Sequence, residues 1–365
     1  MNIGIPRETK NNESRVSIVP NGVEKLSQKG HTIIIEHDAG INIGITDDDY
    51  QKAGAKIVYS VSKLYENAEL ILKVKEPLLG ECNLLRKGHI LFTFLHLAAN
   101  EKLIKTLLEK KVTAIAYETV QMQNGNFPIL SPMSAVAGRL ASQIGANYLQ
   151  VNNGGKGMLL GGIEGAKQGK VGILGGGVVG LNAAEVAVSL GADVTVLEIN
   201  PKRTEFLQNH FGGKVTVLHS HSQNIAKVLA DSDLFIGAVL VPGARAPKLV
   251  SRKMLQGMNR NGVIVDVAID QGGLFETSKP TTHKQPTYVV DNITHYAVPN
   301  IPGIVPHTST YALTEKTISY VEKIADLGWS KAISKDDSLK SGLNISDGQI
   351  VHSAISESFT QIINK

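Results

Sequence analysis

The sequence predicts an α/β protein with two doubly wound domains, separated by a cleft and joined by two long helices. Patterns typical of strands and helices alternate from the first residues onward. A glycine-rich turn follows a buried strand near residue 175, and prolines mark boundaries near residues 128 and 306. These observations place residues 1–128 and 307–365 in one discontinuous domain and residues 129–306 in the other.

The stretch KVGILGGGVVG, residues 170–180, carries the strongest local signal. Its buried strand runs directly into Gly175-x-Gly177-x-x-Gly180, and a helical pattern follows. Gly175 permits a tight turn, Gly177 lets a pyrophosphate approach the backbone, and Gly180 lets the helix pack closely on the strand. The first N–H groups of the helix then face the phosphates. The domain of residues 129–306 is therefore predicted to be a Rossmann-like dinucleotide-binding domain.

The next strand pattern, Asp193–Leu197, ends in the acidic Glu198. A carboxylate at this point accepts hydrogen bonds from an adenosine ribose and repels the 2′-phosphate of NADP, so it favours NAD as the cofactor. Lys202 and Arg203 weaken that preference, unless they only form a solvated first turn of a helix. With both strands, the helix and the acid in place, nucleotide binding explains the glycines better than a purely structural turn.

Other elements follow from periodicity. Strands of the first domain are expected at Asn2–Ile5, His31–Glu36, Leu70–Val74, His89–Phe94 and Val112–Tyr117, and its clearest helix at Glu101–Lys110. Later strands of the second domain are expected at Val215–Leu218, Leu234–Val239, Gly262–Val267 and Tyr288–Val290. The two long helices should run from Met133 to about Val151 and from Thr308 onward, with residues 308–310 as the cap of the second. Residues 152–165 are predicted to be a mobile loop, and the tail after Ser346 one more helix.

Bulk properties exclude several classes of protein. A net charge of +4 is spread along the chain, without a basic run interleaved with aromatic residues, so nucleic acid is not expected as a partner. No apolar signal core or run of about 18 apolar residues is present, so no membrane association is expected. A single cysteine, Cys82, fits a reducing compartment, and the cytoplasm is predicted. No cysteine or histidine pattern indicates a metal site.

Three polar residues close to strand ends are candidates for chemistry. Arg15 lies after the first strand, Lys75 after the LILKV strand, and His96 after the HILFTF strand. Arginine offers a planar fork that binds a carboxylate, and lysine offers a point charge for a carboxylate or a carbonyl oxygen. Histidine is able to exchange a proton near neutral pH. Each alone has a structural explanation, as a surface ion pair, an extended strand-end lysine or a buried histidine. Together they fit a small 2-oxo or 2-amino acid.

The second domain offers further candidates around its predicted strand ends. Asp270 lies past the strand that contains Asp266, so it could reach the nicotinamide and substrate, whereas Asp266 is expected to be buried or structural. Four histidines are expected to be structural or solvent-exposed: His219, His221, His295 and His307. The complete set of cofactor-binding candidates is Ser134, Gly175, Gly177, Val178, Val179, Gly180, Glu198, Arg203, Ser220, Val239, Leu240, Val267, Asp270 and Asn300.

Longer motifs carry a more specific resemblance. They are MNIGIPRETKNNESRVSIVP at 1–20, LKVKEP at 72–77, TFLHLAA at 93–99, SPMSAVAGRLA at 131–141, GILGGGVVGLNAA at 172–184, GAVLVPGARAPKLV at 237–250, VDVAIDQGG at 265–273 and TYAL at 310–313. From end to end the chain resembles the bacterial L-alanine dehydrogenases. The resemblance implies reversible, NAD-dependent oxidative deamination of L-alanine to pyruvate and ammonia, in a homohexamer.

The resemblance also implies roles for individual residues. Arg15 and Lys75 would bind the substrate carboxylate and carbonyl, His96 would be the acid/base, and Asp270 would assist catalysis and contact the nicotinamide ribose. Two departures are visible: Glu198 stands where an aspartate is common, and His307 stands where an arginine is expected.

Three other functions compete with this interpretation. One is the NAD(H)-binding module of a proton-translocating transhydrogenase, which should continue into a linker and membrane segments, whereas this sequence stops at Lys365. The second is an NAD sensor, which predicts a defective catalytic set. The third is a sister dehydrogenase that acts on another amino acid or an opine-type acid such as saccharopine.

Overall fold

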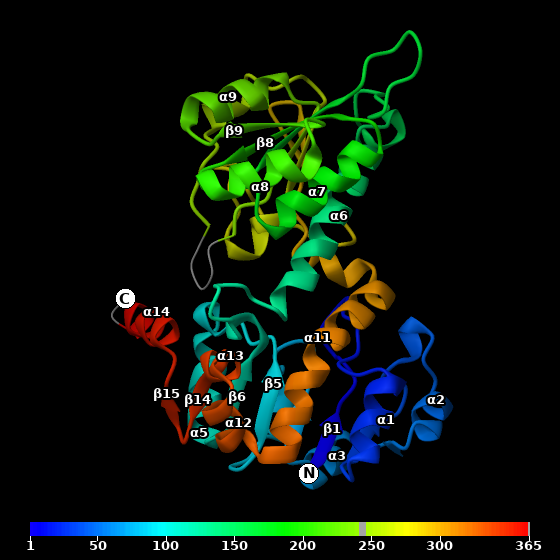
Figure 1. The fold of residues 1–365 in the computed structure, drawn as a ribbon, viewed down its shortest axis with the longest axis vertical. Coiled ribbons are helices and arrows are strands. Elements are labelled where there is room, and N and C mark those ends of the chain that lie inside the picture. Colours follow the sequence, from blue (N-terminus) through cyan, green and yellow to red (C-terminus); the bar gives the residue numbers. More distant parts are fainter. Residues whose placement is uncertain (241–245, 364–365) are drawn as a thin grey trace. The chain divides into compact units, whose positions relative to one another are not determined.

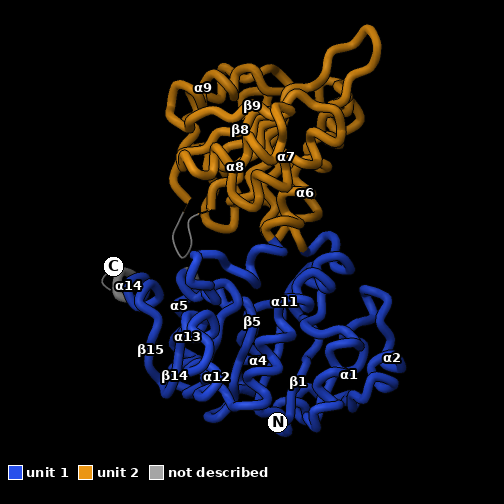
Figure 2. The backbone as a smooth tube through the Cα atoms, in the orientation of Figure 1, with its two compact units in different colours: residues 1–133, 303–365 blue, residues 134–302 orange. Residues whose placement is uncertain are grey.

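The computed structural model describes residues 1–240 and 246–363, and the chain divides into two compact units. Unit 1 comprises residues 1–133 and 303–365, and unit 2 comprises residues 134–302 (Figure 2). The predicted boundaries lay at 128/129 and 306/307. The long helix α6 (Leu130–Tyr148) contains the first boundary, and the helix α11 (Pro306–Leu327) begins just after the second.

Unit 1 is an eight-stranded sheet with helices around it (Figure 1). Its strands are β1 (Asn2–Ile5), β2 (Thr32–Glu36), β3 (Lys56–Val58), β4 (Leu70–Leu72), β5 (Ile90–Thr93), β6 (Thr113–Ala116), β14 (Leu343–Ser346) and β15 (Gln349–Ile350). Its helices are α1 (Pro20–Gln28), α2 (Asp47–Lys52), α3 (Val61–Asn67), α4 (Leu79–Cys82), α5 (Glu101–Lys110), α11, α12 (Trp329–Lys335), α13 (Asp337–Ser341) and α14 (Ser353–Ile363).

The strand order of unit 1 is β15-β14-β6-β5-β4-β1-β2-β3, and β1 to β6 are parallel. The order reverses between β1 and β4, which makes the unit doubly wound with its switch point there. Strands β4, β5 and β6 are buried at every position, as expected when both faces of a parallel sheet are covered. One core cluster joins Leu64, Ile71, Leu91, Ile104 and Ala114 of α3, β4, β5, α5 and β6.

Unit 2 repeats this plan in a seven-stranded sheet of order β12-β13-β11-β10-β7-β8-β9. Its strands are β7 (Lys170–Leu174), β8 (Asp193–Glu198), β9 (Val215–His219), β10 (Leu234–Gly237), β11 (Val263–Asp266), β12 (Thr287–Val290) and β13 (Ile293–Tyr296). Its helices are most of α6 with α7 (Val178–Ser189), α8 (Pro201–Phe211), α9 (Ser222–Asp231) and α10 (Arg252–Leu255). All strands are parallel except β12, and the order reverses between β7 and β10. The two doubly wound, Rossmann-like α/β units that the sequence predicted are therefore confirmed.

Three local predictions need correction. The tail after Ser346 holds a helix, but the hairpin of β14 and β15 was missed, although its turn residues Asp347 and Gly348 both have the positive φ of a tight hairpin turn. Residues 308–310 do not cap α11, because the helix already begins at Pro306 and has no side-chain cap at Val305. α6 begins at Leu130 rather than Met133 and ends at Tyr148 rather than Val151.

Two smaller strands were also missed, and one motif is only partly described. β3 has three residues and none of them is buried, so it lacks the apolar signal of a core strand. β13 is separated from β12 by only two residues, and the two pair in antiparallel fashion. The motif of residues 237–250 includes residues 241–245, which lie outside the described residues. The predicted mobile loop at 152–165 overlaps a short 3-10 helix, Val151–Asn153, at its start and a bridge between Ile163 and Ala166 at its end; its mobility stays a prediction.

Candidate active site

The three substrate candidates of unit 1 follow neighbouring strands. Arg15 follows β1, Lys75 follows β4 and His96 follows β5, and these strands are adjacent and parallel in the sheet. Because the carboxyl ends of parallel strands meet at one edge, the three residues enter one rim of unit 1. That rim includes the switch point between β1 and β4, where doubly wound sheets bind ligands.

Arg15 is held by an acidic neighbour. Its side chain is 2% exposed, and its Nε and Nη2 donate to Oε1 and Oε2 of Glu13 over 2.7 and 2.5 Å. A third nitrogen, Nη1, lies 3.1 Å from Sδ of Met133. Burial alone would raise the pKa of Glu13, but the guanidinium of Arg15 and the ammonium of Lys75 hold that pKa below its ordinary value. Glu13 therefore fixes one edge of the Arg15 fork and is influenced by both cationic candidates.

His96 has an unusual backbone and two acidic partners. Its φ of 50° lies in the left-handed region, and its amide donates to Oε1 of Glu118 over 2.6 Å. The same carboxylate accepts from the amide of Leu95, so Glu118 satisfies two consecutive amides where β5 ends. Nδ1 of His96 lies 3.3 Å from Oε2 of Glu76, and the imidazole remains 45% exposed. The imidazole is thus oriented on one side and accessible on the other.

Glu76 is the acid that orients this imidazole. Burial by itself would raise the pKa of Glu76, yet His96 and Lys10 together lower it to about 2. The carboxylate is therefore ionised throughout the neutral range and accepts a hydrogen bond from Nδ1–H. With the Nδ1–H held by Glu76, Nε2 is the nitrogen that is able to exchange a proton with a substrate.

The pKa of Glu76 predicts an acid-dependent contribution to stability. Because its folded pKa of about 2 lies below the ordinary 4.5, the contribution is complete above pH 4.5 and is lost as the pH falls toward 2. This displacement corresponds to a contribution on the order of 3 kcal/mol to the free energy of unfolding at neutral pH. We expect Glu76→Gln to be less stable than wild type by the same amount from pH 7 down to about pH 4.5, with the difference shrinking as the pH is lowered further to 3.

Urea unfolding followed by tryptophan fluorescence measures this difference, because the only tryptophan, Trp329, lies in α12 of unit 1. Glu315→Gln, at an exposed position of α11, is the matched control and should behave as wild type. A stability difference between Glu76→Gln and wild type that is independent of pH would contradict the assignment.

In unit 2 the glycine turn begins at the switch point. Gly175 follows β7 with a φ of 103°, and a Cβ on it would lie 2.9 Å from Val239, which follows β10. Gly177 is the N-cap of α7, and no atom lies within 4 Å of the place where its Cβ would be. A Cβ on Gly180 would lie 1.8 Å from the carbonyl oxygen of Gly175. Open space at Gly177 and close packing at Gly180 fit the pyrophosphate of a dinucleotide at the start of α7.

Glu198 ends β8 and turns back toward the glycine loop. Oε2 accepts from the amide of Gly176 over 2.8 Å, and Oε1 accepts from the amides of Ile199 and Asn200, also over 2.8 Å. The longer arm of a glutamate thus still places the carboxylate beside the loop, where an aspartate had been expected. Arg203 donates from Nε to the carbonyl oxygen of Gly176 over 2.6 Å, and its guanidinium lies 4.5 Å from the ring centre of Phe206. Arg203 is therefore more than part of a solvated turn.

The other cofactor candidates lie around the same sheet edge. Ser220 follows β9 and donates its amide to the carbonyl oxygen of Glu198 over 3.0 Å. Val239 and Leu240 follow β10, and Val267 and Asp270 belong to the 3-10 helix Val267–Gln271 after β11. Val178 and Val179 open α7. Ser134 is the exception, since it lies on α6 one turn before Gly138, where a Cβ would meet the carbonyl oxygen of Val179 at 2.2 Å.

Asp266 and Asp270 have different surroundings. Asp266 is 2% exposed and accepts hydrogen bonds from Ala268, Leu274 and Ser278, and burial raises its pKa. It therefore holds the loop after β11 together. Asp270 accepts from the amide of Asn300 over 3.2 Å, so two of the candidates are joined directly. Asn300 has a φ of 59°, a left-handed conformation that asparagine tolerates well.

The four histidines expected from the sequence to be structural or exposed do not gather into a site; they are His219, His221, His295 and His307. Nδ1 of His221 accepts from the amide of Asn224 at the start of α9, and the His221 and His219 rings lie 6.0 Å apart. His295 is buried in β13, with Nε2 2.9 Å from the hydroxyl of Thr277. His307 lies in the first turn of α11, with its ring 4.9 Å from that of Tyr311.

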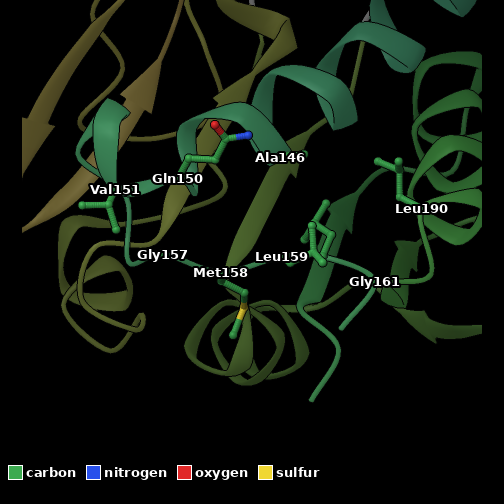
Figure 3. A pocket seen from close by; sticks show the side chains of 9 residues that line it. Ala146, Gln150, Val151, Gly157, Met158, Leu159, Gly161 and Leu190 are labelled. Carbon is green, nitrogen blue, oxygen red and sulfur yellow. The ribbon is translucent and has the colours of Figure 1, made fainter. Parts of the chain in front are cut away.

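A cavity of about 440 Å³ lies elsewhere in unit 2 (Figure 3). It is lined by Ala146, Gln150, Val151, Gly157, Met158, Leu159, Leu160, Gly161 and Leu190. None of these is a predicted cofactor residue, and Leu190 lies at the opposite end of α7 from the glycine loop. The cavity is therefore distinct from the place that the glycine loop prepares for a dinucleotide.

One group of possible metal ligands, His37, Asp38 and Asp47, occurs among the described residues. The two imidazole nitrogens lie 2.5 Å from Asp47 and 3.1 Å from Asp38. Each nitrogen thus already has its own carboxylate partner, which explains the cluster as an ion-paired triad. Among the described residues, no helix is long and apolar enough to cross a lipid bilayer.

Sequence reasoning missed the acidic residues that hold the cationic candidates in place. Glu13, Glu76 and Glu118 lie beside Arg15 and His96, and Glu8 accepts from the amides of Val74 and Lys75. Glu118 follows β6 at the same rim, so the strand-end rule applied to one more strand would have found it. The partners of Glu8 and Glu13 have no comparable sequence signal, because loop geometry alone decides them.

Comparison with known proteins agrees with these features. Residues 4–137 match the family described as "Alanine dehydrogenase/PNT, N-terminal domain", and residues 141–353 match "Alanine dehydrogenase/PNT, C-terminal domain". An "Alanine dehydrogenase" of Methanococcus maripaludis is 51% identical over 358 residues, which cover 98% of this chain and 96% of that protein.

Two solved structures are also similar. One named "L-alanine dehydrogenase" has a TM-score of 0.95 and 49% identity, and the match covers 99% of this chain and 100% of that one. A transhydrogenase from Sinorhizobium meliloti has a TM-score of 0.83 at 24% identity, over 96% of this chain and 100% of that one, which shows a shared fold. With both halves matched and relatives this similar over nearly its whole length, the chain belongs to the alanine dehydrogenase/PNT family.

Proposed function

We propose that the protein is an NAD-dependent L-alanine dehydrogenase, which converts L-alanine reversibly to pyruvate and ammonia. The observation that carries this proposal is the entry of Arg15, Lys75 and His96 into one rim of unit 1, with His96 oriented by the ionised Glu76. A nucleotide-binding module or sensor has no need for such a set. In this proposal unit 1 is the substrate unit and unit 2 is the NAD unit.

The charges of the rim assign the substrate contacts. Arg15 supplies a positive charge for the carboxylate of alanine, and Glu13 holds the Nε–Nη2 edge of the guanidinium and so fixes its plane. Lys75 supplies a point charge for the carboxylate and for the carbonyl oxygen of pyruvate. The dinucleotide is assigned to a second set of residues in unit 2. These are the glycine loop, Glu198, Arg203, Ser220 and the Asp270–Asn300 pair.

His96 moves the protons of the reaction. The amine of alanine must be neutral before the Cα–H bond breaks, and Nε2 of His96 accepts its proton. NAD, which the glycine loop and Glu198 would hold, would supply the acceptor for the hydride that leaves Cα. Once Nε2 has passed this proton to solvent, it takes a proton from the water that adds to the substrate iminium and returns it to the nitrogen of the carbinolamine. It then takes the hydroxyl proton as ammonia leaves and pyruvate forms. Glu76 keeps Nδ1 protonated throughout, so that Nε2 alone exchanges.

A direct assay tests the proposal. We expect the purified protein to form NADH from L-alanine and NAD at alkaline pH, where the free amine is abundant, and to react much more slowly with NADP because of Glu198. Absorbance of the reduced cofactor is the measurement, and light scattering of the same preparation should give the mass of a homohexamer. Tight NADH binding without turnover would favour a transhydrogenase-like or sensor module instead. The single cysteine is consistent with the proposed cytoplasmic location.

A further inference from the structure

The backbone that carries Lys75 and Glu76 leaves the sheet before these residues are reached. β4 ends at Leu72 and pairs with β1 only at Leu70 and Ile71. On the β5 side the ladder continues, because the amide of Lys73 donates to Phe92 and the carbonyl oxygen of Val74 accepts from Phe94. On the β1 side, strand pairing has ended, so the amide of Val74 needs another acceptor.

Glu8 is that acceptor. Its Oε1 accepts from the amide of Val74 over 2.6 Å and lies 3.4 Å from the amide of Lys75. The Glu8 side chain is only 3% exposed, which removes competing water from these contacts. A carboxylate from the loop after β1 thus replaces the missing strand partner where the substrate-binding lysine begins.

A second buried charge holds Glu8 in position. Nζ of Lys73, whose side chain is fully buried, lies 3.3 Å from Oε2 of Glu8 and 2.7 Å from Oε1 of Glu81. Burial alone would lower the pKa of Lys73, but the two carboxylates hold it above its ordinary value, so the ammonium stays charged. Glu81 in turn accepts from the amide of Leu78 over 2.9 Å. The residues on both sides of Lys75 and Glu76 are therefore tied to one ionic group.

The loop after β1 reaches the same segment at a third point. Lys10, two residues after Glu8, forms an ion pair with Glu76, whose other oxygen faces Nδ1 of His96. Glu8 and Lys10 are two residues apart, as are Val74 and Glu76. The loop thus runs beside residues 74–76 and contacts both the backbone of Lys75 and the side chain of Glu76.

We propose that Glu8 and Lys73 are positioning residues, which fix the backbone of residues 74–76 and thereby aim Lys75 at the substrate and Glu76 at His96. They do not touch the substrate themselves. The inference rests on the proposed function for its kinetic consequences, but the geometry of the backbone tests it independently.

The main variant is Glu8→Gln, which keeps the length of the side chain but removes the charge that Lys73 holds. We expect the KM for pyruvate to rise about tenfold or more, because a small displacement of a positioning group has a large effect, with a smaller change in kcat. NADH affinity, a property assigned to unit 2, should stay unchanged. A second variant, Glu8→Asp, keeps the charge beside Lys73 but withdraws the carboxylate from the amide of Val74, so it should fold even if Glu8→Gln does not.

Glu69→Gln is the matched control. Glu69 precedes the same strand, β4, and its carboxylate also accepts from a backbone amide, that of Asn2, over 2.7 Å. It lies at the opposite end of β1 and β4 from Lys75. This control should leave the KM for pyruvate and the amides of residues 74–76 unaffected.

Hydrogen exchange at the amides of Val74 and Lys75 separates this inference from the proposed function. Exchange at these amides should accelerate at least tenfold in the Glu8 variants and not in Glu69→Gln, whether or not the protein turns over alanine. An inactive wild type with accelerated exchange in the Glu8 variants would overturn the function and support the backbone role. Folded Glu8 variants with wild-type exchange and a wild-type KM for pyruvate would overturn the inference.

Discussion

Replacing His96 with asparagine should lower kcat by about 10²–10⁴-fold, the usual contribution of a positioned acid/base group. Asparagine suits this position because His96 has a φ of 50°, and asparagine tolerates the left-handed region better than alanine does. The amide hydrogen bond to Glu118 is a backbone contact and is kept. The variant therefore removes the imidazole, and with it the proton exchange at Nε2, with little disturbance of the backbone.

Steady-state turnover with L-alanine and NAD measures this loss, and NADH titration should give wild-type affinity because the cofactor residues are assigned to unit 2. His210→Ala is the control, since that exposed histidine contacts Glu185, 3.1 Å away, and the rings of Phe206 and Phe211, none of which is assigned to substrate or cofactor. A kcat of His96→Asn within tenfold of the wild-type value would contradict the acid/base role of His96 and would indicate that another group transfers the proton.

Alanine substitutions at two positions of the glycine loop should have different effects. A Cβ on Gly180 would lie 1.8 Å from the carbonyl oxygen of Gly175, so α7 must move away from the turn after β7. We expect Gly180→Ala to reduce the free energy of unfolding by ~3 kcal/mol, the upper part of the usual range for overpacking. Because the N-terminus of α7 moves with the helix, NADH binding should also be largely lost.

Gly177→Ala should leave stability unchanged and weaken NADH binding by about tenfold or more, equivalent to at least ~1.4 kcal/mol. The position has an ordinary φ of −65° and no protein atom near the new methyl group, so only a bound pyrophosphate would meet it. Calorimetry measures stability, and fluorescence titration measures NADH affinity. Gly80→Ala, an exposed glycine of α4 with open space around it, should change neither. Unchanged NADH affinity in Gly177→Ala would rule out a dinucleotide at this turn.

Several features could be predicted because their causes are local. The strand β1 and the helix α5 have the predicted bounds, since apolar periodicity and a capping Asn100 act within a few residues. The unit from β7 to Glu198 was predictable because its turn and its helix packing are local, as shown by Gly180, where a Cβ would lie 1.8 Å from the carbonyl oxygen of Gly175. The strand-end rule brought Arg15, Lys75 and His96 to one rim, because parallel strands necessarily share a carboxyl edge.

Other features depended on contacts between distant residues. Glu118 satisfies the amide of His96 across 22 positions, and Glu8 satisfies that of Val74 across 66. Neither pairing leaves a periodic pattern in the sequence. The acceptor depends on which loop lies near the unpaired amide in the folded chain. The hairpin of β14 and β15 joins the sheet beside β6, more than 200 residues earlier in the chain, and was missed although its turn residues were visible.

The sequence by itself determined the two doubly wound units, the glycine loop for a dinucleotide and the identity of the cationic groups at the substrate rim. Their causes are periodicity, turn chemistry and the direction of parallel strands, which residue order records. Only the tertiary structure decided which carboxylates lie beside Arg15, Lys73 and His96 and that Nδ1 is the nitrogen of His96 that faces Glu76. Buried charges and unpaired amides need partners, and the folded chain supplies these partners from residues that are close in space but distant in the sequence.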